Sequence, residues 1–272
     1  MRQGRVVHGG AVHGCTPWPA QDGASEERVR LADGRVLGAH EVQWLAPFEP
    51  RTIFTLALNY ADHASELAAK SSADQASFLT AQKAEPIVFL KAANAIVGHR
   101  GFTRRPQDAD FMHYECELAV VIGREGRRIP REQALDHVLG YTVANDYAIR
   151  NFLEPYYRPN LRVKNRDAAT ALGPWLVPKA LVPDPMALRL TTHVDGQLVQ
   201  EGTTADMIHD IPSLIAYLSD IMTLSPGDVI LTGTPKGSVD VRPGQEVVCE
   251  VESVGRLVNT LVEDWEPADL RG

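Results

Sequence analysis

Short runs of apolar and β-branched residues recur along the chain and predict a structure built mostly from strands. The clearest run is Leu118–Ile122, which Gly123 closes and which is typical of a buried strand. Four more runs of this kind predict further strands: Ile53–Leu58, Pro86–Lys91, Tyr141–Ala144 and Val229–Thr232.

Other patterns predict one helix and two tight turns. The segment Ile211–Met222 carries its apolar residues at helical spacing, which predicts an amphipathic helix. Asp195-Gly196 and Asp33-Gly34 each stand between strand candidates and predict hairpin turns. Together these patterns predict a mostly β protein with a few helices, an α+β fold arranged as a mixed β-sandwich or roll.

The chain divides into two predicted domains. Residues 1–50 hold short strand candidates separated by prolines and predict a small β-rich N-terminal domain. Residues 51–272 hold the remaining elements. Within them, the basic stretches 98–107 and 158–164 are predicted as surface loops, and the polar residues 70–84 as a lid or a disordered segment.

Composition narrows the classes of function. The net charge of −8 over 272 residues argues against nucleic acid as the main partner. The three cysteines, Cys15, Cys116 and Cys249, lie far apart, which excludes a disulfide framework and fits a reducing cytoplasm. No apolar run approaches the ~20 residues that span a bilayer, and the first residues lack the apolar segment of a signal peptide. We therefore expect a cytoplasmic protein that binds neither membrane nor nucleic acid.

Two carboxylates stand at the entrance of the central strand. In a strand, residues i and i+2 leave the same face, so we expect Glu115 and Glu117 to point together and Cys116 to point away. Like charges side by side near an apolar strand are costly unless a cation lies between them. A divalent metal is one interpretation. The other is a solvated face on a half-exposed strand.

Asp146 supports the metal interpretation. It follows the apolar strand Tyr141–Ala144, where a carboxylate is either a turn former or a ligand. With Glu115 and Glu117 it would make three oxygen ligands, a set that suits Mg²⁺ or Mn²⁺ rather than zinc. Such a cation, with open positions, binds a 2-oxo acid through its carboxylate and keto oxygens and acts as a Lewis acid.

Three further segments carry candidate chemistry, each with an ordinary alternative. Lys164 is either a fixed cation that offsets the carboxylates and holds a substrate oxygen, or a solvated loop lysine. The sequence TGTPKG at 232–237 lacks the spacing of a nucleotide phosphate loop. It presents either a backbone N–H and a hydroxyl to a carboxylate, or an ordinary turn. His63 and Glu66, at i and i+3 of a predicted helix, form by themselves a helix-surface pair.

Taken together, these segments resemble the fumarylacetoacetate hydrolase superfamily over roughly residues 52–263. The resemblance rests on Glu115-x-Glu117, Asp146, Lys164, QEGTTADMI at 200–208 and TGTPKG at 232–237. Three more stretches are similar to the isomerases and decarboxylases of homoprotocatechuate breakdown within that superfamily: LNYADHASEL at 58–67, NDYAIR at 145–150 and YYRPNLRVK at 156–164. The fold that this implies is a fumarylacetoacetate hydrolase-like mixed β-sandwich or roll.

The resemblance also implies roles for residues. Glu115, Glu117 and Asp146 would hold Mg²⁺ or Mn²⁺, and His63, oriented by Glu66, would carry protons from a mobile lid helix. The substrate-binding candidates are Arg150, Tyr157 and Arg158 for a distal carboxylate, Lys164 and Thr234 for other oxygens, and Gly233 and Lys91 beside them. Arg150, Tyr157 and Arg158 have the alternative of a structural loop cluster. One domain copy in the chain implies a homodimer.

The activity implied is isomerisation of 2-hydroxyhepta-2,4-diene-1,7-dioate and decarboxylation of 5-carboxymethyl-2-oxo-hex-3-ene-1,7-dioate. Hydrolases of the superfamily carry a glutamine about two turns after the aspartate ligand, whereas this chain has Leu153-Glu154 there, which favours isomerase and decarboxylase chemistry. Two alternatives remain open. One is another reaction of the superfamily, C–C hydrolysis of an acylpyruvate or fumarylpyruvate, or decarboxylation of a 2-oxo acid. The other is a catalytically silent β-rich binding module.

Overall fold

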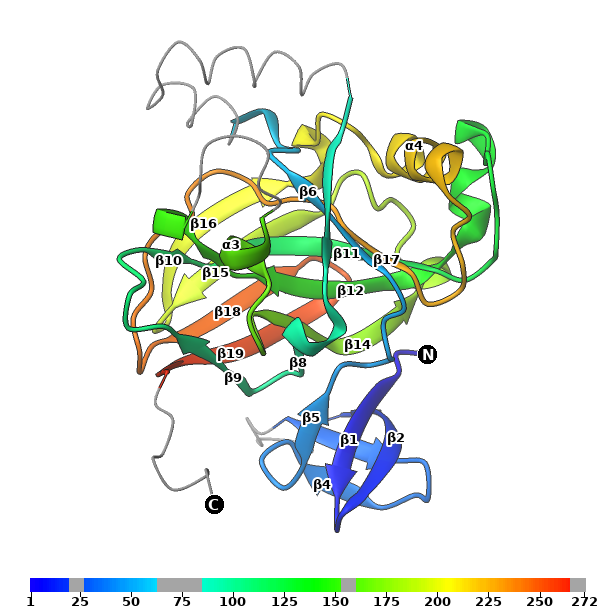
Figure 1. Ribbon diagram of the computed structural model, residues 1–272. Helices are drawn as coiled ribbons and strands as arrows, with labels where there is room; N and C mark the ends of the chain where they lie inside the picture. The colour runs from blue at the N-terminus through cyan, green and yellow to red at the C-terminus, as the bar shows by residue number, and fades with distance from the viewer. Residues whose placement is uncertain (20–26, 63–84, 153–159, 265–272) are drawn as a thin grey trace, which may run out of the picture.

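Three β-sheets form the framework of the computed structural model, which describes residues 1–19, 27–62, 85–152 and 160–264 (Figure 1). A sheet of seven strands lies at the centre and one of five strands packs against it. Another five-stranded sheet, formed near the N-terminus, lies at one end. The prediction of a mostly β fold with few helices is confirmed.

The central sheet runs in the spatial order β7 (Ile87–Lys91), β6 (Ile53–Ala57), β17 (Val229–Leu231), β11 (Cys116–Ile122), β12 (Val138–Asp146), β14 (Thr170–Pro178) and β8 (Ile96–Val97). Strand β11 pairs antiparallel with β17 on one side and β12 on the other. All seven of its residues are buried. Because both faces of β11 are buried, the sequence Leu118–Ile122 is apolar throughout instead of alternating with polar residues.

The five-stranded sheet behind it runs in the order β16 (Gln197–Thr203), β15 (Arg189–Val194), β18 (Glu246–Val251), β19 (Gly255–Glu263) and β9 (Gly101–Arg105). From β11, Cys116, Leu118 and Val120 join the core shared with this sheet. Ala119 belongs to a second apolar cluster with Ala144 and Leu231. Because side chains alternate along a strand, Glu117 shares the face of Ala119, away from the five-stranded sheet.

The N-terminal sheet runs in the order β4 (Val36–Gly38), β3 (Arg28–Leu31), β2 (Ala11–Trp18), β1 (Gly4–His8) and β5 (Gln43–Leu45). It contacts the central sheet through β14, where Trp44 packs edge-on against Trp175 with ring centroids 5.2 Å apart. Gln3 also exchanges two backbone hydrogen bonds with Leu176. A separate domain that ends at residue 50 stays a prediction.

The remaining elements are short. They are the two-stranded pair β10 (Met112–His113) and β13 (Ala148–Ile149), the helices α3 (Leu161–Lys164) and α4 (Ile211–Ile221), and the 3₁₀ helices η1 (Ala93–Ala95), η2 (Arg131–His137), η3 (Arg150–Phe152), η4 (Lys179–Leu181) and η5 (Thr204–Asp206). Helix α4 begins after Asp210, whose carboxylate accepts the Ser213 N–H, as expected of an N-cap. No helix in the described part of the chain is long and apolar enough to cross a membrane.

The amphipathic helix and both hairpins are confirmed, with Asp195 and Gly196 at positive φ in the second turn. Two predicted loops were wrong. Residues 101–105 form β9, parallel to β19, and the Arg105 guanidinium is buried, with Asp240 2.6 Å away. Residues 161–164 form helix α3. The predicted lid, 70–84, lies outside the described residues.

All three cysteines are buried. Burial raises the pKa of the Cys15 thiol to about 12 and raises the pKa of Cys249 well above its ordinary value. Because the thiolate is the reactive form, we expect the thiols of the folded protein to resist a chromogenic disulfide reagent at pH 8. In the guanidinium-unfolded protein all three thiols should react, each releasing one equivalent of the chromophore. Absorbance of the released chromophore measures this. Rapid reaction of one equivalent in the folded protein would contradict the burial.

Candidate metal and substrate site

Three carboxylates converge on the face of the central sheet that lies away from the five-stranded sheet. Glu115 lies immediately before β11, Glu117 lies within it, and Asp146 is the last residue of β12. One oxygen from each lies within 4.8 Å of the others. Glu117 pairs in register with Ala144, and the Glu115 carbonyl accepts the Asp146 N–H at 2.9 Å. The period of two along each strand therefore brings all three predicted ligands together.

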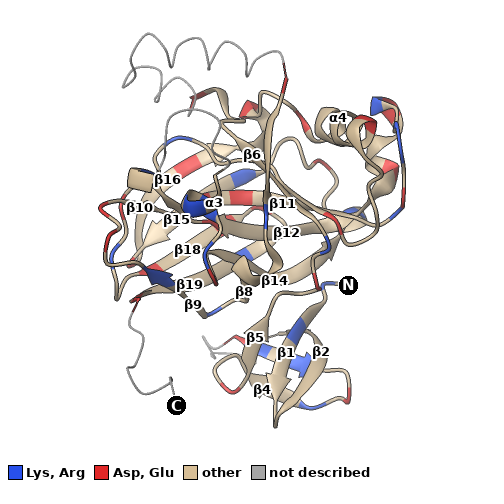
Figure 2. Cartoon of the chain, viewed as in Figure 1, with Lys and Arg blue, Asp and Glu red and all other residues tan. Residues whose placement is uncertain are grey.

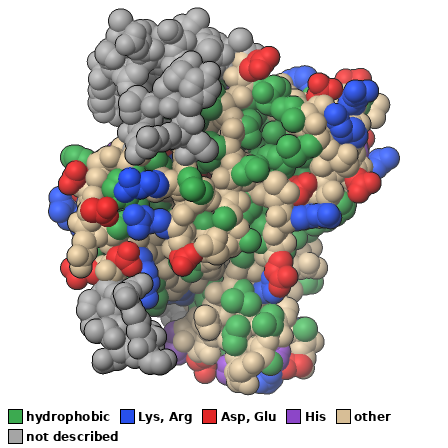
Figure 3. All heavy atoms as spheres, viewed as in Figure 1, with side chains coloured by type: hydrophobic (Ala, Val, Ile, Leu, Met, Phe, Trp, Pro, Cys, Tyr) green, Lys and Arg blue, Asp and Glu red, His purple; other side chains and the backbone are tan. Residues whose placement is uncertain are grey.

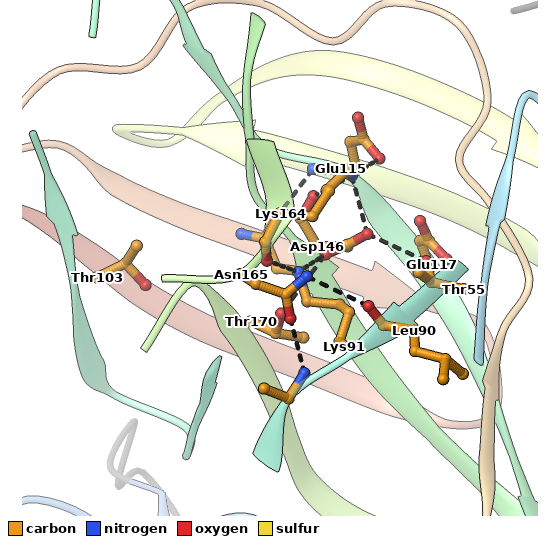
Figure 4. A network of polar contacts seen from close by, with 12 residues as sticks. Thr55, Leu90, Lys91, Thr103, Glu115, Glu117, Asp146, Lys164, Asn165 and Thr170 are labelled. Carbon is orange, nitrogen blue, oxygen red and sulfur yellow. Dashed lines mark hydrogen bonds and ion pairs between the residues drawn. The ribbon is translucent and has the colours of Figure 1, made fainter. Parts of the chain in front are cut away.

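Two lysines reach these carboxylates from other elements (Figure 4). The Lys164 ammonium, on α3, lies 2.5 Å from a Glu115 oxygen and 2.8 Å from Asp146 Oδ2. The Lys91 ammonium, at the end of β7, donates to Asp146 Oδ1 and to the Lys164 carbonyl. Asp146 thus lies between two buried cations. Figure 2 shows the basic α3 beside the acidic start of β11.

The charges explain the direction of each pKa shift. Burial raises the pKa of Asp146, but the Lys164 and Lys91 charges outweigh burial and hold it below its ordinary value. Burial lowers the pKa of Lys164, but the carboxylates around it outweigh burial and raise it. Burial lowers the pKa of Lys91, and the Asp146 charge offsets this only in part. Asp146 and Lys164 therefore stay an ion pair over the physiological range.

Glu117 differs from the other two carboxylates, because no cation in the described part of the chain contacts it directly. Its Oε2 accepts the Gly233 N–H at 2.7 Å, while its Oε1 is buried without a hydrogen-bond partner among the described residues. Burial raises the pKa of Glu117 well above its ordinary value, and the charges of Asp146 and Glu115 raise it further. A buried, unpartnered carboxylate oxygen facing two other carboxylates is the environment that a divalent cation would satisfy. The three residues therefore fit a metal.

The predicted substrate-binding residues fall into two groups. Lys91 and Gly233 already donate to Asp146 and Glu117, so these contacts position the carboxylates. Arg150 donates to Glu115 Oε1 at 2.8 Å, and Thr234 follows Gly233 in the turn beside Glu117. A substrate contact by any of the four stays a prediction. His63, Glu66, Tyr157, Arg158 and the Leu153-Glu154 pair lie outside the described residues.

Two residues near the site were given no role by the sequence interpretation. Thr55, in the middle of β6, donates its hydroxyl to Asp146 Oδ2 at 3.2 Å. A lone polar residue inside the apolar run Ile53–Leu58 was the available signal. Gln200, on β16, is buried and bonds Thr234 and Pro235. Sequence alone had no means of placing this glutamine beside a turn 34 residues away.

Comparisons with known proteins identify relatives of this chain. The fumarylacetoacetate (FAA) hydrolase C-terminal family matches residues 52–262. A 4-hydroxyphenylacetate degradation bifunctional isomerase/decarboxylase of Salmonella dublin is 57% identical over 78% of this chain and 47% of its own length. The chain thus spans about half the length of this curated relative.

Solved structures give the same result for the fold. A 5-carboxymethyl-2-hydroxymuconate delta-isomerase from Mycobacterium smegmatis is 33% identical with a TM-score of 0.79, and the match covers 98% of this chain and all of that chain. A fumarylpyruvate hydrolase from Pseudomonas aeruginosa, solved with Mn²⁺ and pyruvate, is 25% identical with a TM-score of 0.70 over 91% of this chain and 99% of its own.

The substitution Glu117→Gln tests the carboxylate cluster. The amide keeps the size of the side chain and removes one buried like charge, so we expect the metal-free variant to be at least as stable as the wild type. We also expect Mn²⁺ to raise the melting temperature of Glu117→Gln much less than it raises that of the wild type. Thermal unfolding in chelator and in Mn²⁺ measures both effects. The exposed Glu246→Gln variant is the control, and equal Mn²⁺ stabilisation of Glu117→Gln would contradict the assignment.

The substitution Lys91→Met tests the buried ion pair. Removing one partner leaves the Asp146 charge undercompensated, so we expect a loss of roughly 3–5 kcal/mol in the free energy of unfolding. The exposed lysine of η4 gives the control Lys179→Met, for which we expect a change of about 0.5 kcal/mol or less. Urea unfolding measures both variants. Equal losses would show that Lys91 adds no special stabilisation.

Proposed function

The chain belongs to the fumarylacetoacetate hydrolase family, and on this basis we propose that it is a divalent-metal-dependent isomerase and decarboxylase of 2-oxo and 2-hydroxy dicarboxylates. The substrates proposed are 2-hydroxyhepta-2,4-diene-1,7-dioate, for isomerisation, and 5-carboxymethyl-2-oxo-hex-3-ene-1,7-dioate, for decarboxylation. The observation that carries the proposal is the buried cluster of Glu115, Glu117 and Asp146, in which one Glu117 oxygen has no hydrogen-bond partner among the described residues. The Salmonella and Mycobacterium relatives support this choice of reaction by their names.

We propose Mg²⁺ or Mn²⁺ as the ion held by Glu115, Glu117 and Asp146. Oxygen ligands alone favour these hard cations, and the Pseudomonas relative was solved with Mn²⁺ and pyruvate. When bound, the ion would supply Lewis-acid chemistry to the carboxylate and the 2-oxygen of the substrate.

The residues of the chain would bind the substrate and move its protons. The Lys164 ammonium, which already bridges Glu115 and Asp146, would stand beside the substrate's oxygens. Arg150, at the edge of the cluster with 22% of its side chain exposed, is a candidate for the distal carboxylate, with Tyr157 and Arg158. His63, oriented by Glu66, would move a proton between the enol and the carbon chain after CO₂ is lost.

Hydrolysis of a C–C bond in an acylpyruvate is the second candidate, because a fumarylpyruvate hydrolase shares the fold. The two candidates share the metal ligands and differ in the need for a positioned water. Their products also differ, since hydrolysis gives two acids and no CO₂.

The remaining parts of the proposal concern location and assembly. We propose a cytoplasmic homodimer without nucleic-acid or membrane partners, supported by the net charge of −8 and three buried free cysteines. Hydrophobic side chains gather beside α4 on the face seen in Figure 3, which a second subunit would cover in part. Sedimentation equilibrium measures the mass in solution.

Product analysis tests the activity. We expect the wild type with Mg²⁺ to release CO₂ from 5-carboxymethyl-2-oxo-hex-3-ene-1,7-dioate and to yield the 2-oxo-3-ene isomer, and chelator to abolish both. Glu117→Gln should lower turnover by at least about a hundredfold, and Glu246→Gln should leave it unchanged. Mass spectrometry and a CO₂ assay measure the products. Two acids without CO₂ from an acylpyruvate assayed in parallel would favour the hydrolase, and full activity of Glu117→Gln would refute the metal assignment.

A further inference from the structure

Gln200 forms a closed hydrogen-bond network beside the turn that holds Glu117. Its amide nitrogen donates to the Pro235 carbonyl at 2.7 Å and to Thr234 Oγ1 at 3.1 Å. Its amide oxygen accepts the Thr192 hydroxyl at 2.8 Å. Only 3% of the Gln200 surface is exposed, so these bonds are made away from water.

The Pro235 carbonyl sets the direction of every bond in this network. A carbonyl oxygen only accepts, so the Gln200 group that faces it must be the NH₂. A flipped amide would place two acceptors against each other at Pro235, and its NH₂ would face the Thr192 hydroxyl, which would then have to turn its proton away. The second N–H of the amide therefore points at Thr234, and the Thr234 oxygen is the acceptor.

This direction determines what the Thr234 hydroxyl is able to do. One lone pair of Oγ1 is occupied by Gln200, and the hydroxyl proton makes no hydrogen bond to a described residue. Thr234 also follows Gly233, whose N–H donates to Glu117, so the hydroxyl belongs to the turn that touches the carboxylate cluster. A buried hydroxyl that must donate and has no acceptor is suited to an anionic oxygen of a ligand.

The backbone around Gln200 is shaped for this contact. Thr192 pairs with Gln200 and His193 with Leu198, so Val199 is an extra residue that forms a bulge in β16. A bulge turns the next side chain, here Gln200, in a new direction. Gly202 lets β16 lie against the turn, because a Cβ at that position would come within 2.4 Å of the Pro235 side chain.

We propose that Gln200 is a positioning residue that fixes the Thr234 hydroxyl as a hydrogen-bond donor to a carboxylate or oxo oxygen of the substrate. The Gln200 proposal rests on the proposed function, because it takes the ligand to be a 2-oxo acid or a dicarboxylate analogue of one. A glutamine that only stabilised the core would affect stability alone, whereas a positioning residue affects ligand affinity through Thr234.

A double-mutant cycle separates these roles. Gln200→Met keeps the side-chain size and removes the amide, and Thr234→Val removes the hydroxyl. The probe is oxalate, a dicarboxylate analogue of a 2-oxo acid, titrated into Mg²⁺-loaded protein by calorimetry, with KM and kcat for the dienoate measured alongside. Gln197→Met, an exposed change on the same strand, is the control, and Thr234→Ser restores the hydroxyl.

We expect Gln200→Met to weaken oxalate and raise KM about five- to tenfold with kcat changed less, and to have no further effect in the Thr234→Val background. Its effect on the melting temperature should persist in both backgrounds, and Thr234→Ser should bind oxalate almost as the wild type does. If Gln200→Met cannot be purified, Gln200→Glu takes its place, because a carboxylate would accept the Thr234 proton and weaken oxalate further.

Additive effects in the cycle, or unchanged oxalate affinity in a folded Gln200 variant, would overturn the proposal. Failure of the proposed function gives a different result. In that case the wild type would bind Mg²⁺ and oxalate, and the cycle would still report on Gln200, but no dienoate would be turned over.

Discussion

The contact between Asp146 and two buried lysines is the interaction on which the site depends. Asp146 ends the central strand β12, Lys91 comes from the edge strand β7, and Lys164 from α3, so three distant segments meet at one carboxylate. Lys91 also donates to the Lys164 carbonyl and so ties the two cations' segments together. Moving an isolated charge into the protein costs several kcal/mol, and only mutual pairing with good hydrogen bonds offsets it. Each of the three side chains therefore depends on the others to offset the cost of its burial.

The central sheet and the five-stranded sheet contribute different residues to the site. The central sheet supplies the carboxylates from β11 and β12, and its other face packs on the five-stranded sheet. The five-stranded sheet also contributes to the site through its edge strand, β16. This strand lies against the turn at 233–237, where Gln200 contacts Thr234. Glu117 is held by the same turn through Gly233. The turn at 233–237 thus holds the Glu117 carboxylate and carries the Thr234 hydroxyl, and it contacts both sheets.

The local parts of the site were predictable from sequence, and the long-range parts were not. A period of two fixes where Glu115 and Glu117 point, and Asp146 follows a recognisable apolar strand. The Lys91 contact joins residues 55 positions apart and leaves no local pattern, so Lys91 was assigned to substrate rather than to Asp146. Strand β9 was missed for a similar reason. Its arginines are typical of a surface loop, and the sequence does not show that Arg105 is buried in an ion pair with the distant Asp240. Roles for His63 and Glu66 came from family resemblance alone and stay predictions.

The charge balance of the site bears on what binds there. Three carboxylates face Lys91, Lys164 and Arg150, so with every group ionised the described cluster is neutral. A divalent cation alone would leave two positive charges in a site shielded from water, where uncompensated charge is costly. A substrate with two carboxylates would remove that excess. The ion and a dianionic substrate therefore fit the cluster better together than either does alone, and a neutral substrate would fit it poorly. The charge balance thus favours dicarboxylates over monocarboxylic 2-oxo acids.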